Sequence, residues 1–186
     1  MKLTEKTIGT EPIFEGKIIK VRRDTVELPN GGQATREIVE HPGGVAVVAL
    51  DENENVYMVR QYRHPFEKII LEIPAGKLDG PGEDVFDCCK RELEEETGLV
   101  AEKYDYLGAF MVSPGFCQEW IHIYLARSLS QGKAHLDPDE FLEVEKFSLS
   151  QLTDMIMAGE IEDGKTVIGI LKARELMKRE GESLDK

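Results

Sequence analysis

The segment that most constrains the fold lies near the middle of the chain, where a loop rich in glycine and proline leads into an acidic helix. Residues 74–82 are rich in breakers and are expected to form a loop, and residues 84–97 carry apolar and acidic side chains at helical spacing. Gly98 follows, at the position where a helix often ends in a left-handed residue. The pattern predicts a loop–helix unit with defined ends, and the rest of the chain must pack around it.

Apolar runs on both sides of this unit predict strands. Val45–Leu50 is a continuous apolar run, which is typical of a fully buried strand. Further strands are expected at residues 56–60, 69–73, 107–112, 120–126 and 144–147, and helices at 151–158, with Ser150 as N-cap, and at 164–179. Many strands with inserted and terminal helices predict an α+β domain, layered as α/β/α around a mixed sheet.

The N-terminal part of the chain has a different pattern. Residues 17–28 and 34–41 are expected to form two strands, and the turn signal at 29–32 between them predicts a β-hairpin. Residues 41–44 then interrupt the strand pattern. We therefore divide the chain into an N-terminal hairpin segment, residues 1–43, and a main domain, residues 44–186. The first 16 residues carry no motif that we can interpret.

The composition restricts the classes of partner. The chain has 186 residues, which is enough for about one domain, and a formal net charge of −13. That charge would repel nucleic acid and anionic membranes, so we expect neither as a partner. No apolar run is long enough to span a bilayer, and the N-terminus lacks the apolar core of a signal peptide. The three cysteines form no disulfide pattern, so we expect a reducing, cytoplasmic location.

The predicted helix concentrates negative charge on one turn. Glu92 and Glu96 are four residues apart and share one face, with Glu95 at its edge. Like charges at this spacing repel each other, and Mg²⁺, which prefers carboxylate oxygens, would offset the repulsion. The alternative is a solvated acidic face. The preceding glycine-rich loop, Arg91 just before the acids and the closing Gly98 favour the metal-binding interpretation.

Residues 76–99 resemble the Nudix box, the motif of the Nudix hydrolase family. Gly76 is followed by six residues before Glu83, one more than in the family pattern, and seven residues then lead to Arg91-Glu92-Leu93-Glu94-Glu95-Glu96-Thr97-Gly98-Leu99. The extra residue lies within Asp79–Gly82, so the helical acids stay in register with each other. The sequence further resembles the ADP-ribose pyrophosphatase branch in Pro114, 16 residues after Gly98, and in the stretches at 36–37, 61–63 and 72–77.

The resemblance implies a role for several residues. The Ala75 carbonyl and the side chains of Glu92, Glu95 and Glu96 would hold Mg²⁺, with Mn²⁺ as a substitute. Arg91 would orient one of these carboxylates. The general base would be an acid of the loop that follows residue 132, which offers Asp137, Asp139, Glu140 and Glu143; we choose Glu140, and the others stay open.

The substrate would contact a second set of residues. Arg63 is the best candidate for binding the diphosphate, because guanidinium groups match phosphate oxygens. Arg36 and Glu37 lie on the N-terminal hairpin, which in similar enzymes crosses to the partner of a homodimer and completes its site. An ordinary exposed strand pair is the alternative for these two residues. Phe116 could stack on adenine, although a core role is equally open to it.

We therefore expect Mg²⁺-dependent hydrolysis of ADP-ribose to AMP and ribose 5-phosphate. Two alternatives remain: the same chemistry on another nucleoside diphosphate sugar, and a non-catalytic sensor of ADP-ribose. The sensor is disfavoured because Glu92, Glu95 and Glu96 are all present, and because the last predicted helix leaves too few residues for a DNA-binding segment.

Overall fold

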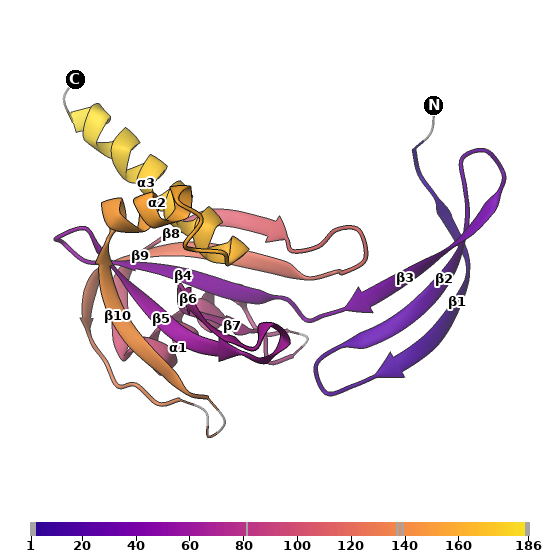
Figure 1. Cartoon of the computed structure of the whole chain (residues 1–186), viewed down its shortest axis with the longest axis horizontal. Helices are drawn as coiled ribbons and strands as arrows, with labels where there is room; N and C mark the ends of the chain where they lie inside the picture. Colours follow the sequence, from indigo (N-terminus) through magenta and orange to yellow (C-terminus); the bar gives the residue numbers. More distant parts are fainter. Residues whose placement is uncertain (1–2, 81, 137, 139, 185–186) are drawn as a thin grey trace.

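The computed structural model describes residues 3–80, 82–136, 138 and 140–184, and its strands form two separate sheets (Figure 1). The larger is a mixed seven-stranded sheet with helices on both faces, and the smaller is a three-stranded sheet made by the N-terminal residues. The α+β class, the mixed sheet and the separate N-terminal sheet predicted from the sequence are confirmed.

The small sheet contains one strand more than predicted. Its strands are β1 (Lys6–Glu15), β2 (Lys20–Glu27) and β3 (Gln33–Glu40), all antiparallel. The predicted hairpin is β2–β3. Strand β1 was not predicted because all ten of its residues are exposed, so its sequence lacks the alternation that marks a half-buried strand. Two backbone hydrogen bonds, from Val39 N–H to the Phe116 carbonyl and from Gln118 N–H to the Val39 carbonyl, join β3 to the main domain.

The large sheet is built around one buried strand, β4 (Gly44–Leu50), in which every residue is buried. Strand β4 runs parallel to β9 (Trp120–Gln131) and pairs antiparallel with two strands on its other edge, with β7 (Ala75–Lys77) at its start and β5 (Asn55–Arg63) at its end. The remaining strands are β6 (Lys68–Glu72), β8 (Leu99–Met111) and β10 (Leu142–Ser148), and a short 3₁₀ helix, His64–Phe66, joins β5 to β6.

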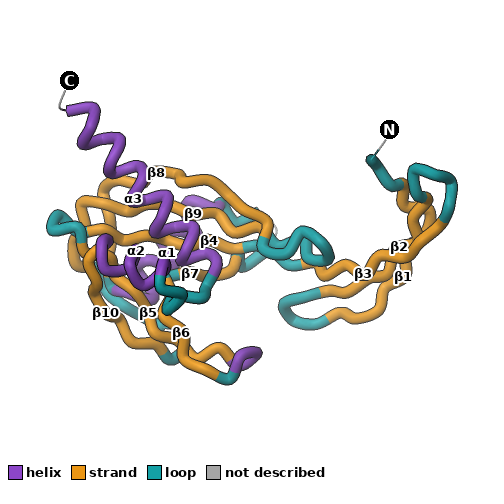
Figure 2. Tube along the Cα trace, turned by 45° about the horizontal axis from the view of Figure 1, so that its top comes forward, coloured by secondary structure: helices purple, strands orange, loops and turns teal. Residues whose placement is uncertain are grey.

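The two faces of β4 belong to two cores, because neighbouring side chains of a strand point to opposite sides. Val45, Val47 and Ala49 pack against Cys88, Cys89 and Leu93 of helix α1 (Val85–Thr97). The alternate residues pack against α2 (Leu149–Met157) and α3 (Gly164–Leu184). Figure 2 shows α3 lying across the strands of the large sheet. The predicted α/β/α layering is therefore present.

The predicted starts of helix α2 and strand β8 both lie too late in the sequence. Helix α2 begins after Ser148, whose hydroxyl accepts the Gln151 N–H at 3.1 Å, so Ser148 and not Ser150 is its N-cap. The reason is that β10 ends in an extended Ser148, and the hydroxyl of that residue reaches the first helical turn. Strand β8 begins at Leu99, directly after α1, eight residues before the predicted start. None of the described helices is both long and apolar enough to cross a membrane.

Candidate active site

Helix α1 presents the box acids in a fixed orientation because both of its ends are capped. The Asp84 carboxylate accepts the N–H groups of Phe86 and Asp87 at 2.9 and 3.1 Å. Gly98 has a φ of 67°, and its N–H donates to the Glu94 carbonyl at 2.8 Å. The apolar face of the helix, which includes Leu93, is buried on the sheet. The rotation of the helix is therefore set, and Glu92 and Glu96 face the protein interior.

The two inward carboxylates are almost completely removed from water. Glu92 is 7% and Glu96 3% exposed. Burial raises the pKa of Glu92 to about 7, helped by the charges of Glu95 and Glu140 and opposed by Arg91. Burial likewise raises the pKa of Glu96 to about 8, and repulsion from Glu92 and Glu140 adds to it. An acidic cluster held in this way favours a bound cation, which would relieve both effects.

Arg91 is the main hydrogen-bonding partner of the box acids. Its guanidinium donates to Glu92 Oε1 at 2.7 Å, to Glu95 Oε2 at 2.9 Å and to Glu83 Oε1 at 3.1 Å. The Asp79 carboxylate lies 3.6 Å from the same group. Arg91 thus contacts one oxygen each of Glu92 and Glu95, and it links the box loop to the helix.

Residue 76 must be glycine for this arrangement, because Glu92 packs directly on its backbone. A Cβ on residue 76 would lie 1.9 Å from the carboxyl carbon of Glu92, far closer than any real contact. The neighbouring Ala75 N–H donates to Glu96 Oε2 at 3.0 Å. Strand β7 therefore holds both buried carboxylates against its main chain, at Ala75 and Gly76.

The residues around Ala75 and Gly76 suit a hard divalent cation in their chemistry. All donors are oxygens, and two of the carboxylates are desolvated and repel their neighbours. Among the described residues, no three His, Cys, Asp or Glu side chains converge in a metal-binding group. Arg91 instead binds oxygens of Glu92, Glu95 and Glu83, and Glu96 accepts the Ala75 N–H.

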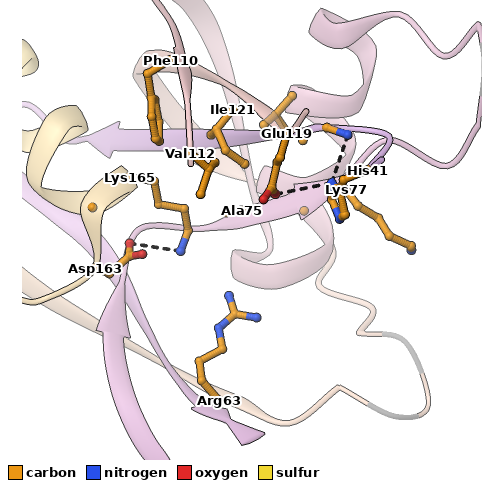
Figure 3. Close-up of a pocket in the computed structure, with 15 residues that line it drawn as sticks. His41, Arg63, Ala75, Lys77, Phe110, Val112, Glu119, Ile121, Asp163 and Lys165 are labelled. Atoms are coloured by element: carbon orange, nitrogen blue, oxygen red, sulfur yellow. Dashed lines mark hydrogen bonds and ion pairs between the residues drawn. The ribbon is translucent and has the colours of Figure 1, made fainter. Parts of the chain in front are cut away.

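A cavity of about 510 Å³ opens beside this loop (Figure 3). Ala75 and Gly76, against which Glu96 and Glu92 pack, form part of its wall, while the box carboxylates themselves are not among its lining residues. Phe110, Val112 and Ile121 form an apolar part of the wall. Three cationic side chains also line the cavity, those of Arg63, Lys77 and Lys165, together with the polar residues His41, Glu119 and Asp163. A cavity of this size and mixed character suits a small polar ligand with an apolar part.

Two of the cations that line the cavity, Arg63 and Lys165, share one buried carboxylate. Arg63 donates to Glu72 through Nε and Nη2, at 2.7 and 2.8 Å, and Lys165 also donates to Glu72, which is 2% exposed. Hydrogen bonding to Glu72 raises the pKa of Arg63, and the charge of Glu96 contributes. The guanidinium is therefore held by Glu72 and lies within electrostatic reach of Glu96.

Lys165 and the apolar wall were not among the residues predicted from the sequence. Lys165 carries one available signal, since a lysine in the first turn of a helix opposes the helix dipole and so calls for another explanation. Phe110 and Ile121 carry no such signal, because apolar residues in a strand usually belong to a core, and Val112 directly follows β8 with no distinguishing pattern.

The loop candidates for the general base are only partly described. Glu140 is half-buried, and its charge acts on both Glu92 and Glu96, so it lies within electrostatic reach of the box acids. Glu143 is exposed on β10. Asp137 and Asp139 lie outside the described residues.

Three predicted substrate contacts do not line the cavity of their own chain. Arg36 donates to the Glu5 carboxylate and to the Thr35 carbonyl, and Glu37 lies beside it on β3. Phe116 is 56% exposed in the turn between β8 and β9. The geometry of one chain therefore brings together Ala75, Arg63 and the box acids, but not these three residues.

The chain is similar to known enzymes over nearly its whole length. Residues 40–167 match the NUDIX domain, and residues 5–39 match the nucleoside diphosphate sugar hydrolase N-terminal domain. It is 48% identical over 178 residues to a methanol dehydrogenase activator of Bacillus methanolicus, covering 94% of this chain and 96% of that protein. It is 47% identical over 170 residues to an ADP-ribose pyrophosphatase of Bacillus subtilis (strain 168), covering 90% of this chain and 91% of that protein.

A solved structure shares the fold. The crystal structure of an ADP compounds hydrolase matches with a TM-score of 0.86 and 22% sequence identity, covering 97% of this chain and 98% of that chain. The acidic residues of the box lie on α1, and Glu92 packs directly on Gly76. Both features are consistent with the two domains that the sequence matches. The chain is an enzyme of the Nudix hydrolase family, and it carries the N-terminal domain of the nucleoside diphosphate sugar hydrolases.

Proposed function

We propose that this protein hydrolyses the diphosphate of ADP-ribose, giving AMP and ribose 5-phosphate. One observation supports it most: the buried Glu92 and Glu96 lie against the Ala75–Gly76 main chain, at the wall of a cavity that also contains Arg63. The relative named ADP-ribose pyrophosphatase, at 47% identity, favours ADP-ribose over other nucleoside diphosphate sugars.

A divalent cation, Mg²⁺ or Mn²⁺, completes the proposed site. The Ala75 carbonyl and the carboxylates of Glu92, Glu95 and Glu96 would hold it, since Arg91 contacts only one oxygen of Glu92 and one of Glu95. When bound, the cation supplies positive charge that stabilises the diphosphate and the leaving oxygen. Arg91 keeps the carboxylates oriented, and Glu83 supports Arg91.

The other steps fall to residues around the carboxylates. Glu140 would take the proton of the attacking water. Its charge acts on both Glu92 and Glu96, which supports a position near the box acids. Arg63 would bind a diphosphate oxygen with the donors that Glu72 leaves available. Water adds across the diphosphate, one phosphate leaves with adenosine as AMP, and the other leaves with ribose.

We further propose a homodimer in which the N-terminal sheets are exchanged. Strand β1 is exposed along its whole length, although it carries Ile8, Ile13 and Phe14, which are 45%, 53% and 54% exposed. A small sheet that exposes several apolar side chains to solvent is typical of a protein–protein interface. In the dimer, Arg36 and Glu37 would contact the substrate of the partner subunit, and Phe116 would stack on its adenine.

The function is tested by a panel of substrates, incubated with Mg²⁺ or with EDTA, with products separated by anion-exchange chromatography. The panel contains ADP-ribose, ADP-glucose, GDP-mannose, NADH, diadenosine polyphosphates and 8-oxo-dGTP. We expect AMP from ADP-ribose, only with Mg²⁺ and faster than from the other compounds. A preference for another diphosphate would keep the chemistry and refute the substrate. Binding of ADP-ribose without turnover would favour the sensor.

A second candidate function comes from the 48% identical relative, which is described as a methanol dehydrogenase activator. We propose it as an additional role of the same protein. It is tested by adding the protein to a purified methanol dehydrogenase and measuring alcohol oxidation. An increased rate that Glu96→Gln abolishes would support it, and an unchanged rate would refute it.

A further inference from the structure

The chain segment before the box glycine is held by bonds from three different elements. Residues 73 and 74 connect β6 to β7 and lie outside both strands. Ile73 N–H donates to Thr166 Oγ1 of α3 at 2.9 Å, and the Pro74 carbonyl accepts the Val47 N–H of β4 at 2.9 Å. Ala75 N–H then donates to Glu96 of α1 at 3.0 Å. Ile73, Pro74 and Ala75 are thus each bonded to a different element, and the partner of Ile73 is a side chain of α3.

Thr166 is well suited to hold this position. The residue is completely buried, and its hydroxyl donates to Asp163 Oδ2 at 2.5 Å. Because the hydroxyl proton is directed to Asp163, an oxygen lone pair is left for the Ile73 N–H. Asp163 also accepts the backbone N–H of Thr166 at 3.0 Å, which fixes the start of α3 against the same carboxylate.

Lys165, in the same turn of α3 as Thr166, holds Glu72, the residue before Ile73. Its ammonium donates to Glu72, the last residue of β6, and lies 3.0 Å from Asp163 Oδ2. Glu72 in turn holds Arg63 with two hydrogen bonds. Both partners of Glu72 are cations, so its buried negative charge is paired on both oxygens.

The backbone of α3 also approaches this segment closely. A Cβ on Gly169 would lie 2.9 Å from Ile73 Cδ1 and 3.0 Å from Val48 Cγ2. The helix therefore packs directly on Ile73, and Thr166 and Gly169 lie on the face that contacts it. A shift of α3 would be transmitted to Ile73 and then to Ala75.

We propose that Lys165 and Thr166 are positioning residues for hydrolysis. They fix Glu72 and Ile73, and through them they place Arg63 and the Ala75 main chain relative to Glu96. The proposal rests on the proposed function, because the groups they place are the ones that would bind the cation and the diphosphate. Neither residue needs to touch the reacting atoms.

The test compares Thr166→Val with a matched control, Thr153→Val. Thr153 is also buried and its hydroxyl also donates to one partner, the Leu149 carbonyl at 2.8 Å, but it lies on α2 away from the cavity. We expect Thr166→Val to lower kcat for ADP-ribose at least ~10-fold below the control, with KM within about 2-fold. Thr166→Ser, which keeps the hydroxyl, should restore kcat.

Lys165→Met and Lys165→Arg form a second pair. We expect the first to lower kcat and the second to retain most of it, because only arginine keeps a cation for Glu72. A second readout is Mn²⁺ affinity, measured by electron paramagnetic resonance without substrate, which should be weaker in Thr166→Val than in Thr153→Val.

Several results would overturn the proposal. One is equal kcat for Thr166→Val and Thr153→Val, and another is a loss of kcat in Thr166→Ser as large as in Thr166→Val. If Thr166→Val does not fold, the Lys165 pair decides in the same way. If the wild type releases no AMP from ADP-ribose, the proposed function fails, and the Mn²⁺ comparison still decides: equal affinities refute the positioning role, and weaker binding in Thr166→Val supports it.

Discussion

The substitution Gly76→Ala should separate catalysis from folding. The added Cβ would lie 1.9 Å from the Glu92 carboxyl carbon and 2.0 and 2.2 Å from its oxygens, whereas real Cβ contacts stay beyond about 3.0 Å. The carboxylate must therefore move by about 1 Å or more. The clashing carboxylate is the end of the flexible Glu92 side chain, so it can move. The backbone at residue 76 lies outside the left-handed region, so it tolerates alanine. The fold should persist while the carboxylate leaves its place.

The size of the effect follows from that displacement. A misplacement of about 1 Å at a catalytic group costs on the order of 100-fold in rate, which equals about 2.7 kcal/mol of transition-state stabilisation. We therefore expect kcat for ADP-ribose to fall about 100-fold. The melting temperature should change by only a few degrees, since the Glu92 carboxylate can remain paired with Arg91.

Gly80→Ala is the matched control, because Gly80 lies in the loop directly after β7 and a Cβ there would meet nothing within 4 Å. The assay is the initial rate of AMP release at saturating ADP-ribose and Mg²⁺, with melting followed by circular dichroism. The reasoning is refuted if Gly76→Ala and Gly80→Ala have the same kcat, or if Gly76→Ala unfolds the protein.

Three further predictions concern pH, thiol chemistry and assembly. Because burial raises the pKa of Glu96 to about 8 from its ordinary 4.5, the folded state binds the proton more tightly, so metal-free protein should lose about 3–4 kcal/mol of stability between pH 5 and pH 8. Melting in EDTA should show this loss for wild type, and a Glu96→Gln protein with the same slope would contradict it. Burial raises the pKa of both Cys88 and Cys89 to about 12, so a thiol reagent at pH 8 should label only the half-buried Cys117 in native protein and all three in urea; native labelling of either buried thiol would be the contrary result. Phe14→Glu should convert the proposed dimer to a monomer in light scattering, and a monomeric wild type would refute the exchanged sheet.

Local signals account for the parts of the structure that could be predicted. The continuous apolar run of β4 and the capped ends of α1 depend on neighbouring residues, so pattern and turn chemistry are enough to locate them. The position of Gly76 before the acidic helix also belongs to a recognisable motif, although its contact with Glu92 becomes visible only in the structure.

Long-range contacts account for what was missed. Strand β1 is specified by pairing with β2 and not by burial, so its sequence shows no alternation. Thr166 contacts Ile73, and Lys165 contacts Glu72, each across 93 positions of the chain, and no local pattern reports such a pairing. The cavity wall likewise combines β4, β8, β9 and α3, which meet only after folding.

The central claim is that the inward carboxylates of α1 form the hydrolytic centre, and one comparison tests it most directly. Glu96→Gln removes a buried carboxylate that faces Ala75, whereas Glu94→Gln changes an acid of the same helix that instead accepts the Lys133 N–H. With ADP-ribose and Mg²⁺, we predict that Glu96→Gln loses at least about 100-fold in kcat while Glu94→Gln stays close to wild type. Equal rates of AMP release from the two variants would contradict the claim.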